Sequence, residues 1–323
     1  MVFQLELFDV AATATVAAIW TAACGRDLAI SPGFVEYNTR PATGALQAGQ
    51  LATHDGQPVG FVLASALPGD PTTSPPDVGW IDAIAVMPAF QRQGFGSALL
   101  SWAEGWLAGL GCTHSRLGAS LRPFAPGLPV QLGTEAVFRA RSYCERSQSS
   151  YVWDVARDLS GYDARSGLPP SASDIGILPA RPGQEEALMA FLRREFPGRW
   201  HFECQELVRE GERLSDIMLL WTGRGVEGFC RMTLEDSRRP IERFYMYRLP
   251  RPWGQLGPIG VSRDCRGRGY GAVLLDAALR YLKSSGVRGC VVDWTSLLEF
   301  YAGFGFEPYR KYVVLLKQLA RSG

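Results

Sequence analysis

The sequence predicts an α/β protein made of two tandem units, and two observations support this fold class. Apolar runs typical of strands alternate along the chain with amphipathic stretches typical of helices. A strand, a glycine-rich turn and an apolar helix also occur twice. Val86 and Gly94 in the first copy correspond to Val261 and Gly269 in the second, and both pairs are 175 positions apart. One offset shared by both positions of a pattern indicates a large duplicated unit.

The first copy begins with an alternating strand and an alanine-rich helix, and Asp55-Gly56 is a strong signal for a hairpin turn. A loop rich in proline and glycine then precedes the central strand. The expected elements are strands over 2–8, 51–53, 58–67 and 80–86 and helices over 11–24 and 97–110.

The second copy starts after a polar stretch that glycine and proline interrupt, which is typical of a linker. We therefore expect an N-terminal domain over 1–160, a linker over 161–173 and a C-terminal domain over 174–323. The expected elements of the second domain are strands over 175–180, 217–222, 226–234, 241–247, 256–261, 289–294 and 309–317 and helices over 183–196, 203–213 and 295–303.

Composition limits the class of protein. Of the 323 residues, 46% are hydrophobic and 20% are charged, which suits a globular protein with a core in each domain. The net charge of +1 gives no argument for a nucleic-acid partner, and no apolar run is long enough for a membrane span. We expect a monomer or a homodimer.

The cysteines and histidines predict no metal site. The seven cysteines form no Cys-x-x-Cys pair, and the three scattered histidines cannot complete a zinc set. The first residues contain acids where a signal peptide carries basic residues, so they are interpreted as a strand of the mature fold. A cytoplasmic, reduced protein is the expectation.

The turn that precedes the second apolar helix has the features of a phosphate site. The first N–H groups of a helix have no partner within it and lie at the positive end of the helix dipole. Gly269 and Gly271 would let phosphate oxygens approach the main chain, and Arg266 and Arg268 add positive charge. In a single copy, such glycines could equally serve only to relieve crowding.

Both copies resemble motif A of the GNAT acetyltransferase superfamily, a strand followed by Arg/Gln-x-x-Gly-x-Gly/Ala at a helix start. In that family the motif binds the pyrophosphate of acetyl-CoA. A dinucleotide-binding site would instead place Gly-x-Gly-x-x-Gly directly after the strand, and neither copy has that order. The resemblance implies two tandem GNAT-fold domains, each with a mixed, mostly antiparallel central sheet flanked by helices.

The resemblance also implies where acetyl-CoA, the co-substrate, binds. The pantetheine would pair with the end of the central strand, and the pyrophosphate would rest on the turn. The implied residues of the second domain are Ile259, Gly260, Val261, Arg266, Gly267, Arg268, Gly269, Tyr270, Gly271 and Ala272. Those of the first domain are Ile84, Ala85, Val86, Gln91, Arg92, Gln93, Gly94, Phe95, Gly96 and Ser97.

Tyr301 is the candidate proton donor. It begins Tyr301-Ala-Gly-Phe-Gly-Phe, which matches the family's Tyr-x-x-x-Gly-Phe, where the tyrosine protonates the leaving thiolate. A core tyrosine in a helix that ends at a glycine is the alternative. The first domain has Phe138 instead, which cannot donate a proton. We therefore expect the C-terminal domain to be the main catalyst and the N-terminal domain to be degenerate but still able to bind CoA.

Asp82 is the candidate general base of the first domain. It lies four residues before Val86, where many family members have a glutamate, and a strand aspartate paired with a neighbour is the alternative. Gly257 stands at the same place in the second domain. Deprotonation there is left to Glu242, another carboxylate, a water chain or an amine that is already neutral.

Arg199, Trp200 and Glu242 form the candidate substrate set. Arg199 and Trp200 lie between the first two helices of the second domain, a region that commonly lines the acceptor pocket in the family. An aromatic tucked onto the core after a Pro-Gly turn is the alternative. The predicted function is transfer of acetyl from acetyl-CoA to a primary amine of a small molecule by direct attack in a ternary complex. A non-catalytic CoA-binding sensor or scaffold and an acyltransferase for protein or peptide amines are left open.

Overall fold

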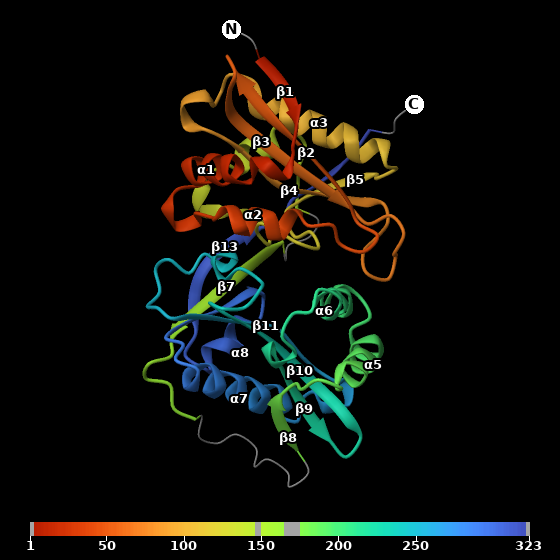
Figure 1. Ribbon diagram of the computed structural model, residues 1–323, viewed down its shortest axis with the longest axis vertical. Helices are drawn as coiled ribbons and strands as arrows, with labels where there is room; N and C mark the ends of the chain where they lie inside the picture. The colour runs from red at the N-terminus through yellow and green to blue at the C-terminus, as the bar shows by residue number, and fades with distance from the viewer. Residues whose placement is uncertain (1–2, 146–149, 165–174, 321–323) are drawn as a thin grey trace. The chain divides into compact units, whose positions relative to one another are not determined.

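The computed structural model describes residues 3–145, 150–164 and 175–320. Contacts within the chain divide it into two compact units, Met1–Val152 with Arg310–Gly323 and Trp153–Tyr309. Each unit has a sheet in which most neighbouring strands are antiparallel, with helices packed on it (Figure 1). The predicted class, α/β with two tandem units, is therefore confirmed.

The first unit is built on a six-stranded sheet of order β1-β2-β3-β4-β5-β14. Its strands are β1 (Phe3–Leu7), β2 (Leu46–His54), β3 (Gln57–Ala66), β4 (Val78–Val86), β5 (His114–Leu117) and β14 (Leu316–Gln318). Its helices are α1 (Thr13–Cys24), α2 (Pro32–Thr39), α3 (Phe95–Gly109) and α4 (Glu135–Arg139). Asp55 and Gly56, with φ of 48° and 80°, form the predicted hairpin turn between β2 and β3.

The second sheet has the order β6-β13-β7-β12-β11-β10-β9-β8. Its strands are β6 (Leu128–Pro129), β7 (Tyr151–Asp158), β8 (Gly176–Pro179), β9 (Ile217–Thr222), β10 (Gly225–Leu234), β11 (Trp253–Val261), β12 (Gly289–Thr295) and β13 (Glu307–Val313). The helices of the second unit are α5 (Glu185–Glu195), α6 (Arg199–Arg209), α7 (Tyr270–Ser284) and α8 (Leu298–Ala302).

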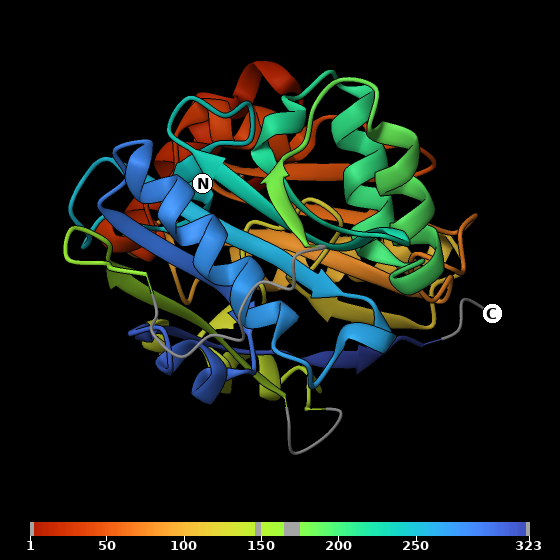
Figure 2. The same ribbon diagram turned by 90° about the horizontal axis from the view of Figure 1, so that it is seen from below.

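Side-chain alternation along β9 shows how the helices of the second unit are layered. Ile217 and Leu219 pack in one apolar cluster with Phe191 of α5. Met218 and Leu220 point to the opposite face and pack in another cluster with Leu279 of α7. Helices α5 and α6 thus cover one face of the sheet and α7 covers the other, as Figure 2 shows.

The predicted repeat is visible in the bounds of the elements. Strands β4 and β11, the short 3-10 helices Pro88–Phe90 and Arg263–Cys265, and helices α3 and α7 begin and end at positions related by the same offset of 175. The duplicated sequence pattern therefore produces a duplicated strand-turn-helix in the two units.

In both units the central strand separates from its parallel neighbour partway along. β4 pairs with β5 only over Val78–Ile81, and β11 pairs with β12 only over Trp253–Leu256. Each central strand then continues to Val86 or Val261 while still paired on its other side. Among the described residues, this leaves one edge of the strand end without a neighbouring strand.

Three expectations differ from the structure. The expected strand 241–247 is wrong, because Ile241–Phe244 is a 3-10 helix that starts after Pro240 and ends at Tyr245, whose φ is 53°. The expected closing strand 309–317 is divided into β13 and β14. The compact units also do not coincide with the limits 1–160 and 174–323, because β7 pairs with β12 and β14 pairs with β5.

Residues 165–174 of the expected linker lie outside the described residues. In the part of the chain that the structure covers, no helix is both long enough and apolar enough to span a bilayer. The same residues contain no cluster of three or more His, Cys, Asp or Glu side chains that could hold a metal ion.

Candidate active site

The turn before α7 presents unpaired backbone amides. Gly267 and Gly269 have φ of 72° and 83°, a region that favours glycine, and Gly269 is the residue directly before α7. Among the described residues, no protein acceptor meets the backbone N–H groups of 267–271. An exposed helix start with free N–H groups has a geometry that can bind phosphate, so the turn is compatible with the predicted pyrophosphate site.

The first unit has the same turn. Gly94 has φ of 94° and directly precedes α3. The side-chain amide of Gln91 donates to the carbonyl of Val86 at 3.0 Å, and in the second unit the guanidinium of Arg266 approaches the carbonyl of Val261 at 3.5 Å. Both units therefore keep the same main-chain turn, with a cationic side chain at this position only in the second.

The predicted pantetheine residues lie where the central strands have left their parallel neighbours. Ile259, Gly260 and Val261 pair with β10 and lie beyond the last residue that pairs with β12. Ile84, Ala85 and Val86 pair with β3 and lie beyond the last pair with β5. A strand edge of this kind can accept an extended ligand as an added strand.

Tyr301 lies on α8 and is buried, with 4% of its surface exposed. Its ring meets the rings of Phe300 and Phe306 edge-on at centroid distances of 5.0 and 6.0 Å. Among the described residues, no group hydrogen-bonds to its hydroxyl. Burial raises the pKa of the Tyr301 hydroxyl, and the negative charge of Asp293 raises it further. The hydroxyl therefore stays protonated and can donate.

The first unit places a different pair of rings at this position. Phe138 is the fourth residue of α4, as Tyr301 is of α8, and its ring meets that of Tyr143 edge-on at 5.9 Å. The hydroxyl belongs to Tyr143 and shares a hydrogen bond of 2.9 Å with the Ser115 hydroxyl. Each unit has two edge-on aromatic rings here, Phe138 with Tyr143 and Tyr301 with Phe306. The hydroxyl is on the second ring in the first unit and on the first ring in the second unit.

Asp82 is buried in β4 at an irregularity in the pairing of β3 with β4. The Ser65 hydroxyl donates to it at 2.7 Å and the Gln47 side-chain amide at 3.1 Å. Burial raises the pKa of this carboxyl to about 6, although its hydrogen bonds oppose the shift. This environment is compatible with both roles considered for Asp82, a general base and a strand aspartate paired with its neighbours.

Asp293 is a residue of this site that sequence reasoning missed. It lies near the end of β12, and the side-chain amide of Gln255 donates to its Oδ1 at 2.6 Å. Gln255 is held in turn, because its Oε1 accepts from the Thr233 hydroxyl at 2.9 Å and from Arg239 at 2.7 Å. Its partners lie on other strands, so local sequence gives no signal for it beyond an acidic residue in an apolar run.

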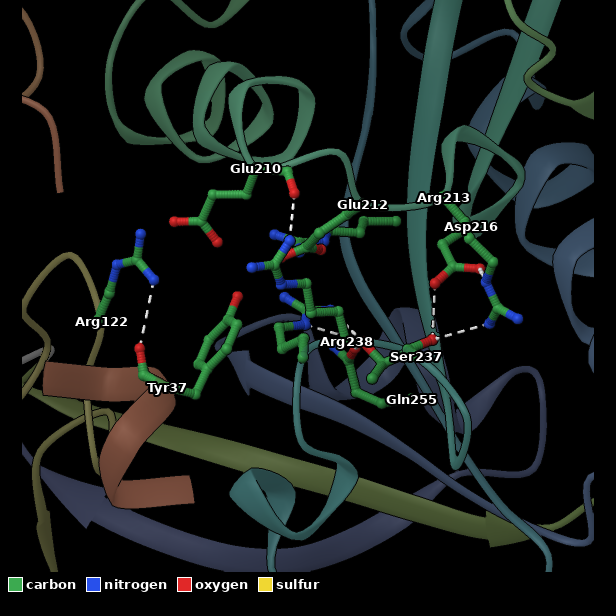
Figure 3. A network of polar contacts seen from close by, with 12 residues as sticks. Tyr37, Arg122, Glu210, Glu212, Arg213, Asp216, Ser237, Arg238 and Gln255 are labelled. Atoms are coloured by element: carbon green, nitrogen blue, oxygen red, sulfur yellow. Dashed lines mark hydrogen bonds and ion pairs between the residues drawn. The ribbon is translucent and has the colours of Figure 1, made fainter. Parts of the chain in front are cut away.

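The loop that carries Arg239 is fixed by its own polar contacts, some of which are drawn in Figure 3. The Ser237 hydroxyl donates to Asp216 at 2.6 Å, and Arg213 donates to the other oxygen of Asp216 at 3.1 Å. Arg239 itself is buried and also donates to the Thr233 hydroxyl at 2.8 Å. This network holds a positive charge next to the Gln255 side chain.

Arg199 and Trp200, which the sequence placed in the acceptor region, have different surroundings. The Arg199 guanidinium lies 4.3 Å from the ring centroid of Trp294, the residue that follows Asp293 in the sequence. Arg199 also forms an ion pair with Glu203 at 2.5 Å. Trp200 packs against Phe196 at a centroid distance of 4.7 Å. Arg199 is therefore beside the end of β12, whereas Trp200 belongs to an aromatic cluster.

Glu242, the third candidate of the substrate set, lies in the 3-10 helix before β11. Its negative charge contributes to raising the pKa of the Tyr247 hydroxyl, after the larger effect of burial. The same charge helps to raise the pKa of Arg251, for which a hydrogen bond to Glu235 is the main cause. Its role as a base or substrate ligand stays a prediction.

Comparison with known proteins identifies the duplicated unit. The family model "Acetyltransferase (GNAT) family" matches residues 17–122 and 185–306. A mycothiol acetyltransferase of Actinosynnema mirum is 25% identical over 265 residues, which are 80% of this chain and 80% of that protein. The tandem layout also resembles that of mycothiol synthase.

Two solved structures share the fold. A glucosamine N-acetyltransferase region of a fungal multi-domain GH3 beta-N-acetylglucosaminidase matches with a TM-score of 0.86 and 24% identity. That match covers 98% of this chain, which spans 38% of the longer fungal protein. A tandem GNAT protein from the clavulanic acid biosynthesis pathway matches over the whole of both chains with a TM-score of 0.71 and 16% identity.

The family model therefore matches both copies of the strand, turn and helix that the two units share. GNAT enzymes use acetyl-CoA as their co-substrate. The chain belongs to the GNAT family of N-acetyltransferases and carries two units of that family in tandem.

Proposed function

We propose that this enzyme transfers the acetyl group of acetyl-CoA to a primary amine of a small molecule, and that its second unit is the main catalyst. The observation that carries the proposal is the hydroxyl of Tyr301, which has no partner among the described residues, whereas the first unit has Phe138 at the same position. Only the second unit therefore combines the turn, the open strand edge and a proton donor at this place.

The proposed reaction is a direct attack in a ternary complex. The amides of 267–271 hold the pyrophosphate, and the free edge of β11 holds the pantetheine. A backbone N–H within Ile259 to Val261 stabilises the oxyanion of the tetrahedral intermediate. Positioning of the two substrates supplies most of the acceleration, so the chain needs no covalent intermediate.

Tyr301 completes the proposed reaction by protonating the sulfur that leaves as the carbon–sulfur bond breaks. The buried hydroxyl keeps its proton at neutral pH, because burial and the nearby negative charge raise its pKa. Proton delivery to a leaving group typically contributes a rate factor of about 10² to 10⁴.

The proposed acceptor class follows from the relatives and from one contact. One relative is named for mycothiol and the fungal region is named for glucosamine, an amino sugar. Arg199, stacked on Trp294 at the end of β12, offers a cationic and a flat apolar surface to a polar ring. We therefore expect an acceptor that carries its amine on a polar, sugar-like body.

The test compares Tyr301→Phe with Tyr143→Phe. Release of CoA from acetyl-CoA is followed with a panel of glucosamine, aminoglycosides, polyamines, amino acids and peptides. Tyr301→Phe should lower kcat by about 10²-fold or more with little change in CoA binding, because it removes only the proton donor. Tyr143→Phe should change kcat by less than about twofold, because that hydroxyl meets Ser115.

Equal turnover by the wild type and the Tyr301→Phe variant would exclude Tyr301 from the reaction. A wild-type protein that binds acetyl-CoA but acetylates nothing in the panel would contradict the proposal. Turnover confined to the peptides would leave acetyl transfer intact and would replace the small-molecule acceptor by protein amines.

A further inference from the structure

At two equivalent positions, the first unit has an aspartate and then a glycine, whereas the second unit has a glycine and then an aspartate. Asp82 of β4 corresponds to Gly257 of β11, and Gly118 corresponds to Asp293, each at the offset of 175. The residues that follow the second position, Ala119 and Trp294, both have a positive φ, of 57° and 53°, whereas at the position itself Gly118 has a positive φ and Asp293 does not. The second unit thus has an acidic residue on β12 where the first has one on β4.

The Asp293 carboxylate lies beside the position on β11 that corresponds to Asp82. A Cβ atom built on Gly257 would lie 3.1 Å from Oδ1 of Asp293. A side chain at Gly257 would therefore crowd the Asp293 carboxylate, and it would also be strained, because φ there is 139°. The oxygen of Asp293 thus lies directly beside β11 at the position that corresponds to Asp82.

We infer that Asp293 is the general base of the second unit, and that it accepts the proton of the acceptor amine directly or through one water. This inference rests on the proposed function. The position is at the point where β11 and β12 separate, because their last pair is Leu256 with Val292, one residue before Gly257 and Asp293. A carboxylate there lies next to the strand segment proposed to align the thioester.

The surroundings of Asp293 suit a base that meets a substrate. Its side chain is only partly buried, and among the described residues no group donates to its Oδ2, since Gln255 binds Oδ1. Burial raises its pKa above the ordinary value, and the negative charge of Glu203 adds to that effect. The positive charges of Arg239 and Arg243 and the Gln255 hydrogen bond oppose it.

The proton balance is complete without any further reactant. Asp293 takes one proton from the ammonium form of the acceptor, and the freed nitrogen lone pair forms the carbon–nitrogen bond. The carbon–sulfur bond then breaks, and the electron pair leaves with sulfur, which takes the proton of Tyr301. The second nitrogen proton returns to the Tyr301 oxygen through solvent, and Asp293 releases its proton to water, so one proton is released per acetyl group transferred.

The experiment compares Asp293→Asn with the wild type on two nucleophiles. One is the panel amine with the highest turnover, and the other is hydroxylamine, which is already uncharged at pH 7 and needs no base. With the amine, Asp293→Asn should lower kcat/KM by about 10²-fold at pH 7 and by less than about tenfold at pH 9.5, where the amine is neutral. With hydroxylamine, the loss at pH 7 should be less than about threefold.

Asp276→Asn is the matched control. Asp276 is a buried aspartate of the same unit, but both of its oxygens are occupied, by the Tyr162 hydroxyl at 2.6 Å and by Arg280 at 2.8 Å. Its variant should show neither the selective loss with the amine nor the recovery at high pH. Circular dichroism and acetyl-CoA affinity check that both variants are folded.

Each outcome of the experiment either supports or overturns the role of Asp293 as general base. A loss by Asp293→Asn that is equal for the amine and hydroxylamine, and constant with pH, would make Asp293 a structural residue and overturn the inference. Unchanged turnover would overturn it as well, while the acetyl transfer of the wild type would still support the proposed function. A wild type that acetylates no panel amine would overturn the proposed function, and the inference with it.

Discussion

The two units share the same strand, turn and helix, but they place their carboxylate and ring hydroxyl at different positions. Both have a 3-10 turn, a glycine with positive φ and a long helix at the same offset, so both keep the turn proposed to bind phosphate. The carboxylate lies on β4 in the first unit, as Asp82, and on β12 in the second, as Asp293. The ring hydroxyl is bonded to Ser115 in the first unit and has no partner in the described part of the second.

Under the proposed function, CoA binding and proton transfer are separable in the repeated fold. Main-chain amides bind phosphate whatever side chains surround them, so the turn survives changes elsewhere. Proton transfer needs a particular group at a particular distance, so moving one hydroxyl between two edge-on rings would be enough to remove it. The comparison therefore predicts a unit that still binds CoA and a unit that binds CoA and reacts.

The largest expected effect, on acetyl-CoA binding and turnover, comes from substitution in the glycine turns. Gly269→Glu should abolish acetyl-CoA binding at the second unit and all measurable turnover, because a carboxylate would face the phosphates and a side chain would be strained at φ of 83°. Isothermal titration should show the loss of one binding site per chain.

Gly94→Glu is the paired variant, at φ of 94° in the first unit. It should remove the other site and leave turnover within about threefold. The assignment of catalysis to the second unit would have to be reversed if Gly94→Glu abolished turnover and Gly269→Glu did not.

The next largest effect concerns the pH dependence of stability. The pKa of Asp82 is raised from its ordinary 3.8 to about 6, so the folded state binds this proton more tightly than the unfolded state. Stability from this group is thus fully present below about pH 4 and is lost as pH rises through about 6. At 1.36 kcal/mol per unit the total is roughly 3 kcal/mol.

Asp82→Asn removes this contribution. The difference in unfolding free energy between variant and wild type should shift by about 3 kcal/mol in favour of the variant between pH 4 and pH 7. Urea unfolding followed at both pH values measures it. A difference that stays constant across this range would show that Asp82 titrates normally, which contradicts the buried environment described for it.

A smaller effect tests whether the first unit could accept the carboxylate of the second. Gly118 has φ of 65°, and a Cβ atom there would lie 2.7 Å from the carbonyl oxygen of Ala125. Gly118→Ala should therefore destabilise the protein by about 2 kcal/mol, from backbone strain and close contact together. Gly56→Ala, at φ of 80° with no atom within 4 Å, should cost only about 1 kcal/mol. Equal costs would show that space is not what excludes a side chain at position 118.

The sequence predicted the parts of the site that depend on local chain order. The glycine turns at 94 and 269 could be located, because turn and helix signals lie within a few residues of one another. Tyr301 is placed by its resemblance to the family motif, and its role stays a prediction. Asp293 could not be located in this way. Its partners Gln255 and Thr233 lie on other strands, and only the sheet brings them together.

The same reasoning explains the errors in the fold. The strand expected at 241–247 has apolar residues that suit a strand, but Ile241, Phe244 and Met246 pack instead in one cluster with Val291. The chain end was expected in the second domain, yet β14 pairs with β5, more than half the chain away in sequence. Long-range pairing of this kind leaves no trace in local periodicity.

The smallest expected effect concerns the hydroxyl of Tyr143 and separates stability from turnover. Tyr143→Phe leaves the buried Ser115 hydroxyl without its 2.9 Å partner while keeping the edge-on ring contact with Phe138. A lost buried hydrogen bond costs about 1 kcal/mol, so the urea midpoint should fall slightly. Turnover should be unchanged, because the hydroxyl proposed to react belongs to Tyr301 of the second unit. If Tyr143→Phe instead lowers turnover without changing stability, the first unit also donates a proton, and its hydroxyl has moved without losing its function.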